Sequence, residues 1–146
     1  MNTKIKIAVV DDDESVHDIL RYFYRDSDLA EITHSFTNPH HVLEEAPKLD
    51  FDLCFLDIRL PCMSGITVAQ MLGHKPVIFL TGSEDKLKEA LELNPIDVIT
   101  KPFTRERLDQ GLHKAAKLIS ECIEYAVFNV AESHKKVKIY LPDILF

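Results

Sequence analysis

The sequence has few cysteines, and their positions exclude two kinds of site. Cys54, Cys62 and Cys122 are odd in number and far apart, so they form neither a disulfide framework nor a metal-binding spacing. Cys54 lies in an apolar run and is expected to be a small buried side chain. Free thiols of this kind are typical of a reducing compartment, and we expect a cytoplasmic protein.

Long apolar runs and excess basic charge are also missing. No stretch approaches the ~18 apolar residues of a membrane-spanning helix, and no signal peptide begins the chain, so we expect no membrane partner. With 17 Lys and Arg against 24 Asp and Glu, the formal net charge is −7, which disfavours nucleic acid unless basic residues cluster. The group Lys135, Lys136 and Lys138 is more typical of a solvated strand face than of a DNA-binding patch.

Several common catalytic patterns are absent. The sequence contains no glycine-rich phosphate loop, no Ser/His/Asp pattern and no zinc signature. His40, His41 and His74 have no partner at metal-ligand spacing, so surface or loop positions are expected for them.

The sequence does contain a regular alternation of short apolar runs with segments of helical period, from residue 4 to about residue 124. We expect strands over residues 4–10, 30–36, 51–56, 76–80 and 96–100, each followed by a helix. Five such units predict an α/β fold, a doubly wound five-stranded parallel sheet with the order 2-1-3-4-5.

The last 22 residues break this alternation. Residues 125–130 and 137–141 have the composition of two β-strands, which predicts a C-terminal β extension. We therefore divide the chain into a domain over residues 1–124 and a segment over 125–146. Because an isolated hairpin is only marginally stable, this segment is either the start of a truncated second domain or a hairpin tail packed on the first.

Polar residues stand where four of the expected strands end. Asp11 and Asp12 follow the first strand, and Asp57, Thr81 and Lys101 follow three others. The carboxyl ends of parallel strands open onto one edge of the sheet, so these side chains should share a pocket. Carboxylates suit Mg²⁺, an Asp can accept a phosphoryl group, and the ammonium and hydroxyl groups can bind phosphoryl oxygens.

Each of these signals has a simpler explanation when taken alone. An Asp after a strand is usually a turn or helix-capping residue, and Asp13 is expected to be one. Thr81 with Gly82 would be an ordinary turn, and Lys101–Pro102 a loop in which the X-Pro bond can be cis. Their joint occurrence at matching strand ends favours the phosphoryl and metal site.

At these residues the chain resembles the receiver domain of two-component response regulators, over residues 4 to about 122. The resemblance rests on residues 9–13, 55–61, Gly65, 80–82 and 100–103. It implies that Asp57 is phosphorylated by a phosphohistidine of a sensor histidine kinase or by acetyl phosphate. It also implies that Mg²⁺ is bound by Asp12, Asp57 and the backbone carbonyl of Arg59, with Asp11 acting through water.

The resemblance further implies that Lys101 and Thr81 bind the phosphoryl oxygens and that the Lys101–Pro102 bond is cis. It also implies that the chain is not an enzyme: it catalyses only the transfer of a phosphoryl group to its own Asp57 and the slow loss of that group. Thr81 and Val98 occupy the switch positions, but receivers commonly carry Tyr or Phe where this chain has Val98. We expect dimerisation through the face of the last two βα units.

The tail resembles the opening of a LytTR-type DNA-binding domain over residues 127–130 and 137–146. That implies a transcriptional regulator as the parent protein, with DNA binding expected of the parent and not of this fragment. Two alternatives remain: a stand-alone receiver acting through protein contacts, and a metal-dependent phosphatase. The phosphatases usually carry a second Asp two residues after the nucleophile, where this chain has Arg59.

Overall fold

The computed structural model describes residues 3–73, 75–82 and 84–132. Five parallel strands form one sheet in the order β2-β1-β3-β4-β5, which confirms the predicted topology. The strands are β1 (Ile5–Val10), β2 (Ala30–Phe36), β3 (Leu53–Asp57), β4 (Val77–Thr81) and β5 (Asp97–Thr100). The helices are α1 (Glu14–Tyr24), α2 (Pro39–Glu45), α3 (Gly65–Leu72), α4 (Leu87–Leu91) and α5 (Arg105–Glu132), and a 3₁₀ turn, η1, covers Ala46–Lys48.

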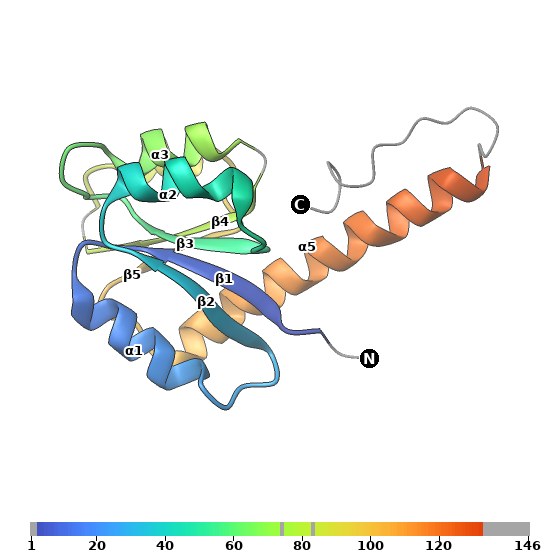
Figure 1. Cartoon of the computed structure of the whole chain (residues 1–146), viewed down its shortest axis with the longest axis horizontal. Coiled ribbons are helices and arrows are strands. Elements are labelled where there is room, and N and C mark those ends of the chain that lie inside the picture. Colours follow the sequence, from blue (N-terminus) through green and yellow to red (C-terminus); the bar gives the residue numbers. More distant parts are fainter. Residues whose placement is uncertain (1–2, 74, 83, 133–146) are drawn as a thin grey trace.

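Helices cover both faces of the sheet (Figure 1). Helices α1 and α5 pack on one face, where Leu20, Leu108 and Leu112 join a cluster with inward residues of β1 and β3. Helices α2, α3 and α4 pack on the other, around Val42, Val68 and Ala90. Every residue of β3 and of β4 is buried, as expected of central strands in a parallel sheet covered on both sides.

Local capping explains where the first two helices begin. The Asp13 side chain accepts a hydrogen bond from the backbone N–H of Ser15, and the Asn38 side chain accepts one from that of His40. Each bond satisfies a donor that the first turn of a helix leaves unpaired. The predicted cap at Asp13 is confirmed.

The predicted strand over residues 125–130 is wrong. These residues belong to α5, which continues to Glu132 and extends beyond the sheet (Figure 1). Extending an existing helix gains one hydrogen bond for each residue fixed and needs no new nucleation, whereas a strand here would need a partner. The apolar positions Ile119, Ile123, Ala126 and Val130 also keep helical spacing. The other predicted strand, residues 137–141, lies outside the described residues.

Among the described residues, no helix is both long and apolar enough to cross a membrane.

Candidate functional site

Three carboxylates meet at the carboxyl edge of the sheet. Asp57 is the last residue of β3, and Asp11 and Asp12 follow β1, its neighbour in the sheet. One carboxylate oxygen from each lies within 4.8 Å of the others. Asp11 and Asp57 are buried, while Asp12 is exposed. Hard oxygen donors at this separation, with one side open to solvent, fit a Mg²⁺ ion that keeps several of its waters.

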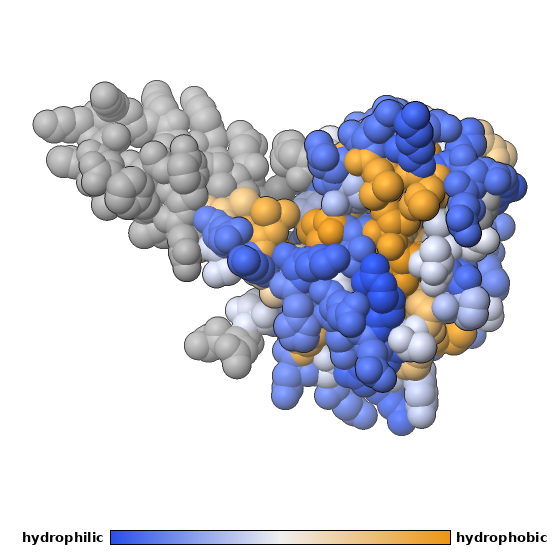
Figure 2. All heavy atoms as spheres, turned by 180° about the vertical axis from the view of Figure 1, so that it is seen from behind, coloured by the Kyte–Doolittle hydropathy of each residue, from blue (hydrophilic) through white to orange (hydrophobic). Residues whose placement is uncertain are grey.

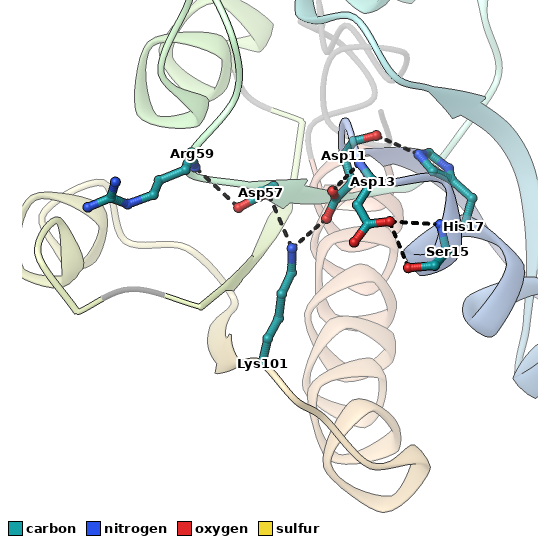
Figure 3. A network of polar contacts seen from close by, with 7 residues as sticks. All are labelled: Asp11, Asp13, Ser15, His17, Asp57, Arg59 and Lys101. Atoms are coloured by element: carbon teal, nitrogen blue, oxygen red, sulfur yellow. Dashed lines mark hydrogen bonds and ion pairs between the residues drawn. The ribbon is translucent and has the colours of Figure 1, made fainter.

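Lys101 supplies the positive charge of this site. Its Nζ donates to Asp11 Oδ2 at 2.7 Å and to Asp57 Oδ2 at 3.2 Å (Figure 3). The backbone N–H of Lys101 donates to the carbonyl of Thr81 at 2.8 Å, so the pairing of β5 with β4 sets the position of the lysine. The Lys101–Pro102 peptide bond is cis, as predicted.

Burial and charge shift the pKa values of both partners. Burial raises the pKa of Asp57, and the nearby Asp11 carboxylate adds to this, although Lys101 opposes them. For Lys101, burial alone would lower the pKa. The hydrogen bond to Asp11 and the charges of Asp57 and Asp11 outweigh burial, so the pKa of Lys101 is raised and the ammonium form is favoured.

The third carboxylate of the acidic triplet has a different role. Asp13 Oδ1 accepts hydrogen bonds from the backbone N–H of Ser15 at 2.9 Å and from its hydroxyl at 2.7 Å. The backbone N–H of Asp13 donates to Asp11 Oδ1 at 2.9 Å. Asp13 therefore caps α1 and helps to orient Asp11. It does not belong to the cluster of possible metal ligands, which consists of Asp11, Asp12 and Asp57.

Arg59 contributes to the site through its backbone. Its N–H donates to Asp57 Oδ1 at 3.2 Å. Its guanidinium forms an exposed ion pair with Asp85 and points away from Lys101 (Figure 3). The use of its carbonyl as a metal ligand stays a prediction.

Gly65 is required behind Asp57 for steric reasons. A Cβ added at this residue would lie 1.9 Å from the backbone oxygen of Asp57, which no side chain can accommodate. At Gly82 an added Cβ would lie 4.0 Å from the nearest atom, Cβ of Lys101, so the space beside the lysine is open.

The two expected switch residues lie on adjacent strands. Thr81 is buried at the end of β4, beside Asp57 at the end of β3. Val98 in β5 is half-buried and packs against the apolar cluster of α2, α3 and α4. The side chain of Val98 has no hydrogen-bond donor or acceptor, so it forms no hydrogen bond with the carboxylates.

The sequence prediction missed His17. This residue of α1 is buried, and its Nε2 lies 2.7 Å from the backbone oxygen of Asp11 (Figure 3). A lone histidine within an acidic helical segment has no sequence signal that would connect it to the site.

Comparison with known proteins agrees with this geometry. The family model described as the response regulator receiver domain matches residues 7–113. The chain belongs to the response regulator receiver family. The response regulatory domain of protein MrkE from Klebsiella pneumoniae has a TM-score of 0.69 and 29% identity, and the match covers 77% of this receiver chain and 96% of that one.

Curated relatives of this receiver include transcriptional regulators. BtsR of Salmonella typhi is 33% identical over 113 residues, which is 75% of this chain and 47% of the relative. The sensory transduction protein LytR of Staphylococcus epidermidis is 35% identical over 114 residues, 75% of this chain and 45% of the relative. BtsR of Escherichia coli matches over 141 residues at 31% identity, 94% of this chain and 57% of the relative. The chain thus spans about half the length of the curated relatives it matches.

Proposed function

We propose that this receiver is a phosphorylation-dependent signalling switch, in which Asp57 accepts a phosphoryl group from the phosphohistidine of a sensor histidine kinase. The observation that carries the proposal is the position of Asp57. It is a buried carboxylate at the end of a central strand, 3.2 Å from the Lys101 ammonium and next to two further carboxylates.

In the proposed transfer, an oxygen of Asp57 attacks phosphorus while the phosphorus–nitrogen bond of the donor breaks. The imidazole leaves with the bonding electrons and takes up a proton, and Asp57 becomes an acyl phosphate. Mg²⁺, when bound, supplies the positive charge that screens the two negative reactants. Asp12, Asp57 and the Arg59 carbonyl would hold the ion, with Asp11 acting through water.

Lys101 and Thr81 would stabilise the transferred group. Lys101 already contacts Asp57, so its ammonium lies where charge develops on the phosphoryl oxygens. The Thr81 hydroxyl would donate a hydrogen bond to one of these oxygens. Apart from this transfer and a slow loss of the phosphoryl group, we propose no catalytic activity.

Mass spectrometry after incubation with acetyl phosphate and Mg²⁺ tests the chemistry. We expect the wild type to gain the mass of one phosphoryl group and Asp57→Ala to gain none. Asp12→Ala and chelation of the metal should both slow the gain. A phosphoryl group on the Asp57→Ala chain, or no gain by the wild type, would contradict the proposal.

The surface of the last two βα units is the proposed dimer interface. Seen from the side opposite to Figure 1, hydrophobic side chains form a band across the molecule (Figure 2). Exposed apolar residues on α4 and α5 are Leu91, Leu118 and Ile123. Phosphorylation at Asp57 would shift a pre-existing equilibrium of the Thr81 loop and this face towards the dimer.

For the parent protein we propose a cytoplasmic transcriptional regulator with a LytTR-type DNA-binding domain. The support is the resemblance of residues 137–146 and the fact that the BtsR relatives are named transcriptional regulatory proteins. Residues 127–130 no longer support it, because they are helical. The reading frame beyond Phe146 distinguishes the alternatives. About 80 further residues rich in predicted strands would support this parent, because a small domain has about that length. A stop codon would favour a stand-alone receiver.

A metal-dependent phosphatase is disfavoured by position 59. The Arg59 guanidinium pairs with Asp85 and offers no carboxylate to act as an acid beside Asp57. Sustained turnover of a phosphomonoester would reverse this conclusion.

A further inference from the structure

His17 is a buried polar residue that the proposed chemistry does not use. The residue is 1% exposed, and Nε2 lies 2.7 Å from the backbone oxygen of Asp11. A carbonyl oxygen can only accept, so Nε2 carries the hydrogen and donates it. In this tautomer Nδ1 carries a lone pair.

Nδ1 of His17 is buried and has no hydrogen-bond partner among the described residues. Leaving a buried polar atom unpaired costs free energy, and most buried polar atoms in native proteins avoid it. A leucine at this position would avoid that cost, but it would leave the Asp11 carbonyl without the hydrogen bond from Nε2.

The bond acts on the peptide unit that joins two of the carboxylates. The carbonyl of Asp11 and the amide nitrogen of Asp12 lie in one rigid plane, because the peptide bond is planar. A donor fixed on α1 therefore sets the rotation of this plane. That rotation in turn sets the direction in which the exposed side chain of Asp12 leaves the chain.

Every other polar group of Asp11 is also fixed. Its N–H donates to the Phe36 carbonyl at 3.1 Å, Oδ1 accepts from the Asp13 N–H at 2.9 Å, and Oδ2 accepts from Lys101 at 2.7 Å. His17 provides the remaining contact, to the backbone oxygen. Since Asp12 is exposed, its orientation depends on the peptide plane before it.

We propose that His17 is a positioning residue for the metal site, which orients the Asp11–Asp12 peptide so that both carboxylates face Asp57. This inference rests on the proposed use of Mg²⁺. His17 touches neither the ion nor the phosphoryl group and acts through the backbone of Asp11.

Calorimetric titration of the full 146-residue chain with MgCl₂ tests the proposal. His17→Leu keeps an apolar side chain of similar size without the donor, and His17→Gln keeps an N–H donor near the place of Nε2. We expect the Mg²⁺ dissociation constant to rise about tenfold in His17→Leu and to stay within about threefold of wild type in His17→Gln, by analogy with other residues that orient metal ligands. Thermal unfolding of both variants is measured without metal.

His113→Leu is the matched control. His113 Nδ1 also lies 2.8 Å from a backbone oxygen, that of Asp109, but it is exposed on α5. Its removal should leave the Mg²⁺ dissociation constant unchanged. If His17→Leu only lowers the unfolding temperature and binds Mg²⁺ like the wild type, the residue is structural and the inference is wrong. If the wild type itself binds no Mg²⁺, the proposed function fails as well.

Nitrogen-15 NMR of the wild-type imidazoles provides a second test if His17→Leu does not fold. We expect the Nε2–H tautomer of His17, and a shift of its Nε2–H signal that follows Mg²⁺ binding with the same dissociation constant. An Nδ1–H tautomer, or an Nε2–H signal that ignores Mg²⁺, would overturn the inference.

Discussion

Lys101 lies closer to Asp11 than to Asp57, with Nζ–Oδ2 distances of 2.7 and 3.2 Å. The ammonium thus bridges two carboxylates that would otherwise repel each other at the carboxyl edge of the sheet. Because a bound cation would face the same oxygens, Lys101 and Mg²⁺ compete electrostatically for the site.

Replacing Lys101 separates its effect on Mg²⁺ binding from its effect on phosphorylation. We expect Lys101→Met to tighten Mg²⁺ binding about tenfold, equivalent to about 1.4 kcal/mol of relieved repulsion. The same change should slow phosphorylation by acetyl phosphate, because a positive group beside Asp57 is lost. Calorimetry measures the first effect and time-resolved mass spectrometry the second. Lys114→Met is the control, since Lys114 pairs with Asp97 on β5 and should alter neither. Unchanged Mg²⁺ affinity in Lys101→Met would contradict the competition.

Most of the site was predictable because it depends on strand ends. An apolar run followed by Asp57, Thr81 or Lys101 places the polar residue at the carboxyl edge of a parallel sheet, whatever the details of packing. His17 was not predictable in this way. Its burial and its contact with Asp11 arise from how α1 packs on the sheet, which the sequence around His17 does not reveal.

The strand predicted over residues 125–130 shows the limit of local composition. Its Val, Phe and Tyr residues favour strands, but β-propensity depends on having a sheet to join. In the structure the segment continues α5 instead. The composition of a short segment therefore does not decide its structure when a helix already leads into it.

Gly65 should be essential to stability. A Cβ at this residue would lie 1.9 Å from the Asp57 backbone oxygen, so Gly65→Ala must displace the loop between β3 and α3. We expect the free energy of unfolding in urea to fall by about 3 kcal/mol, as for severe overpacking.

Gly82→Ala is the comparison, because its added Cβ would meet only Lys101 Cβ at 4.0 Å. Its stability should stay within about 0.5 kcal/mol of wild type, as for changes that meet no close neighbour. Phosphorylation by acetyl phosphate should slow, since the methyl group narrows the approach to Asp57. Equal loss of stability in both variants would show that the contact at Gly65 is not the cause.

Leu91 tests the proposed dimer face. This residue of α4 is 54% exposed, and Leu91→Glu places a charge where an apolar contact is expected. We predict that phosphorylated Leu91→Glu sediments as a monomer at concentrations where the phosphorylated wild type dimerises. Met71→Glu is the matched control, since Met71 is 61% exposed but lies on α3. Loss of the dimer in Met71→Glu with retention in Leu91→Glu would place the interface elsewhere.

Asp97 should make the free energy of unfolding depend on pH in the acidic range. Its buried carboxylate accepts from Arg107 Nη1 at 2.7 Å and Nη2 at 2.9 Å, and from Lys114 at 3.2 Å. Burial alone would raise the pKa of Asp97, but the hydrogen bonds from Arg107 and Lys114 outweigh it, so the pKa is lowered. The unfolded chain then binds more protons than the folded one in acid. The stability that Asp97 contributes is therefore complete above its ordinary pKa and is lost as pH falls through the lowered, folded-state value.

Asp97→Asn removes this contribution. We expect it to lower the free energy of unfolding by about 2 kcal/mol at about pH 7, as for the loss of charged hydrogen bonds. The difference from wild type should shrink steadily as the pH falls through the lowered pKa of Asp97, because the protonated carboxyl group is then as uncharged as the amide of Asn. Urea unfolding across this pH range measures both curves. Asp50→Asn, which breaks an exposed pair with Lys6, should change little at any pH, because such pairs are screened by solvent. A constant gap between wild type and Asp97→Asn down to the lowest pH would mean that the ion pairs at Asp97 do not cause the acid sensitivity.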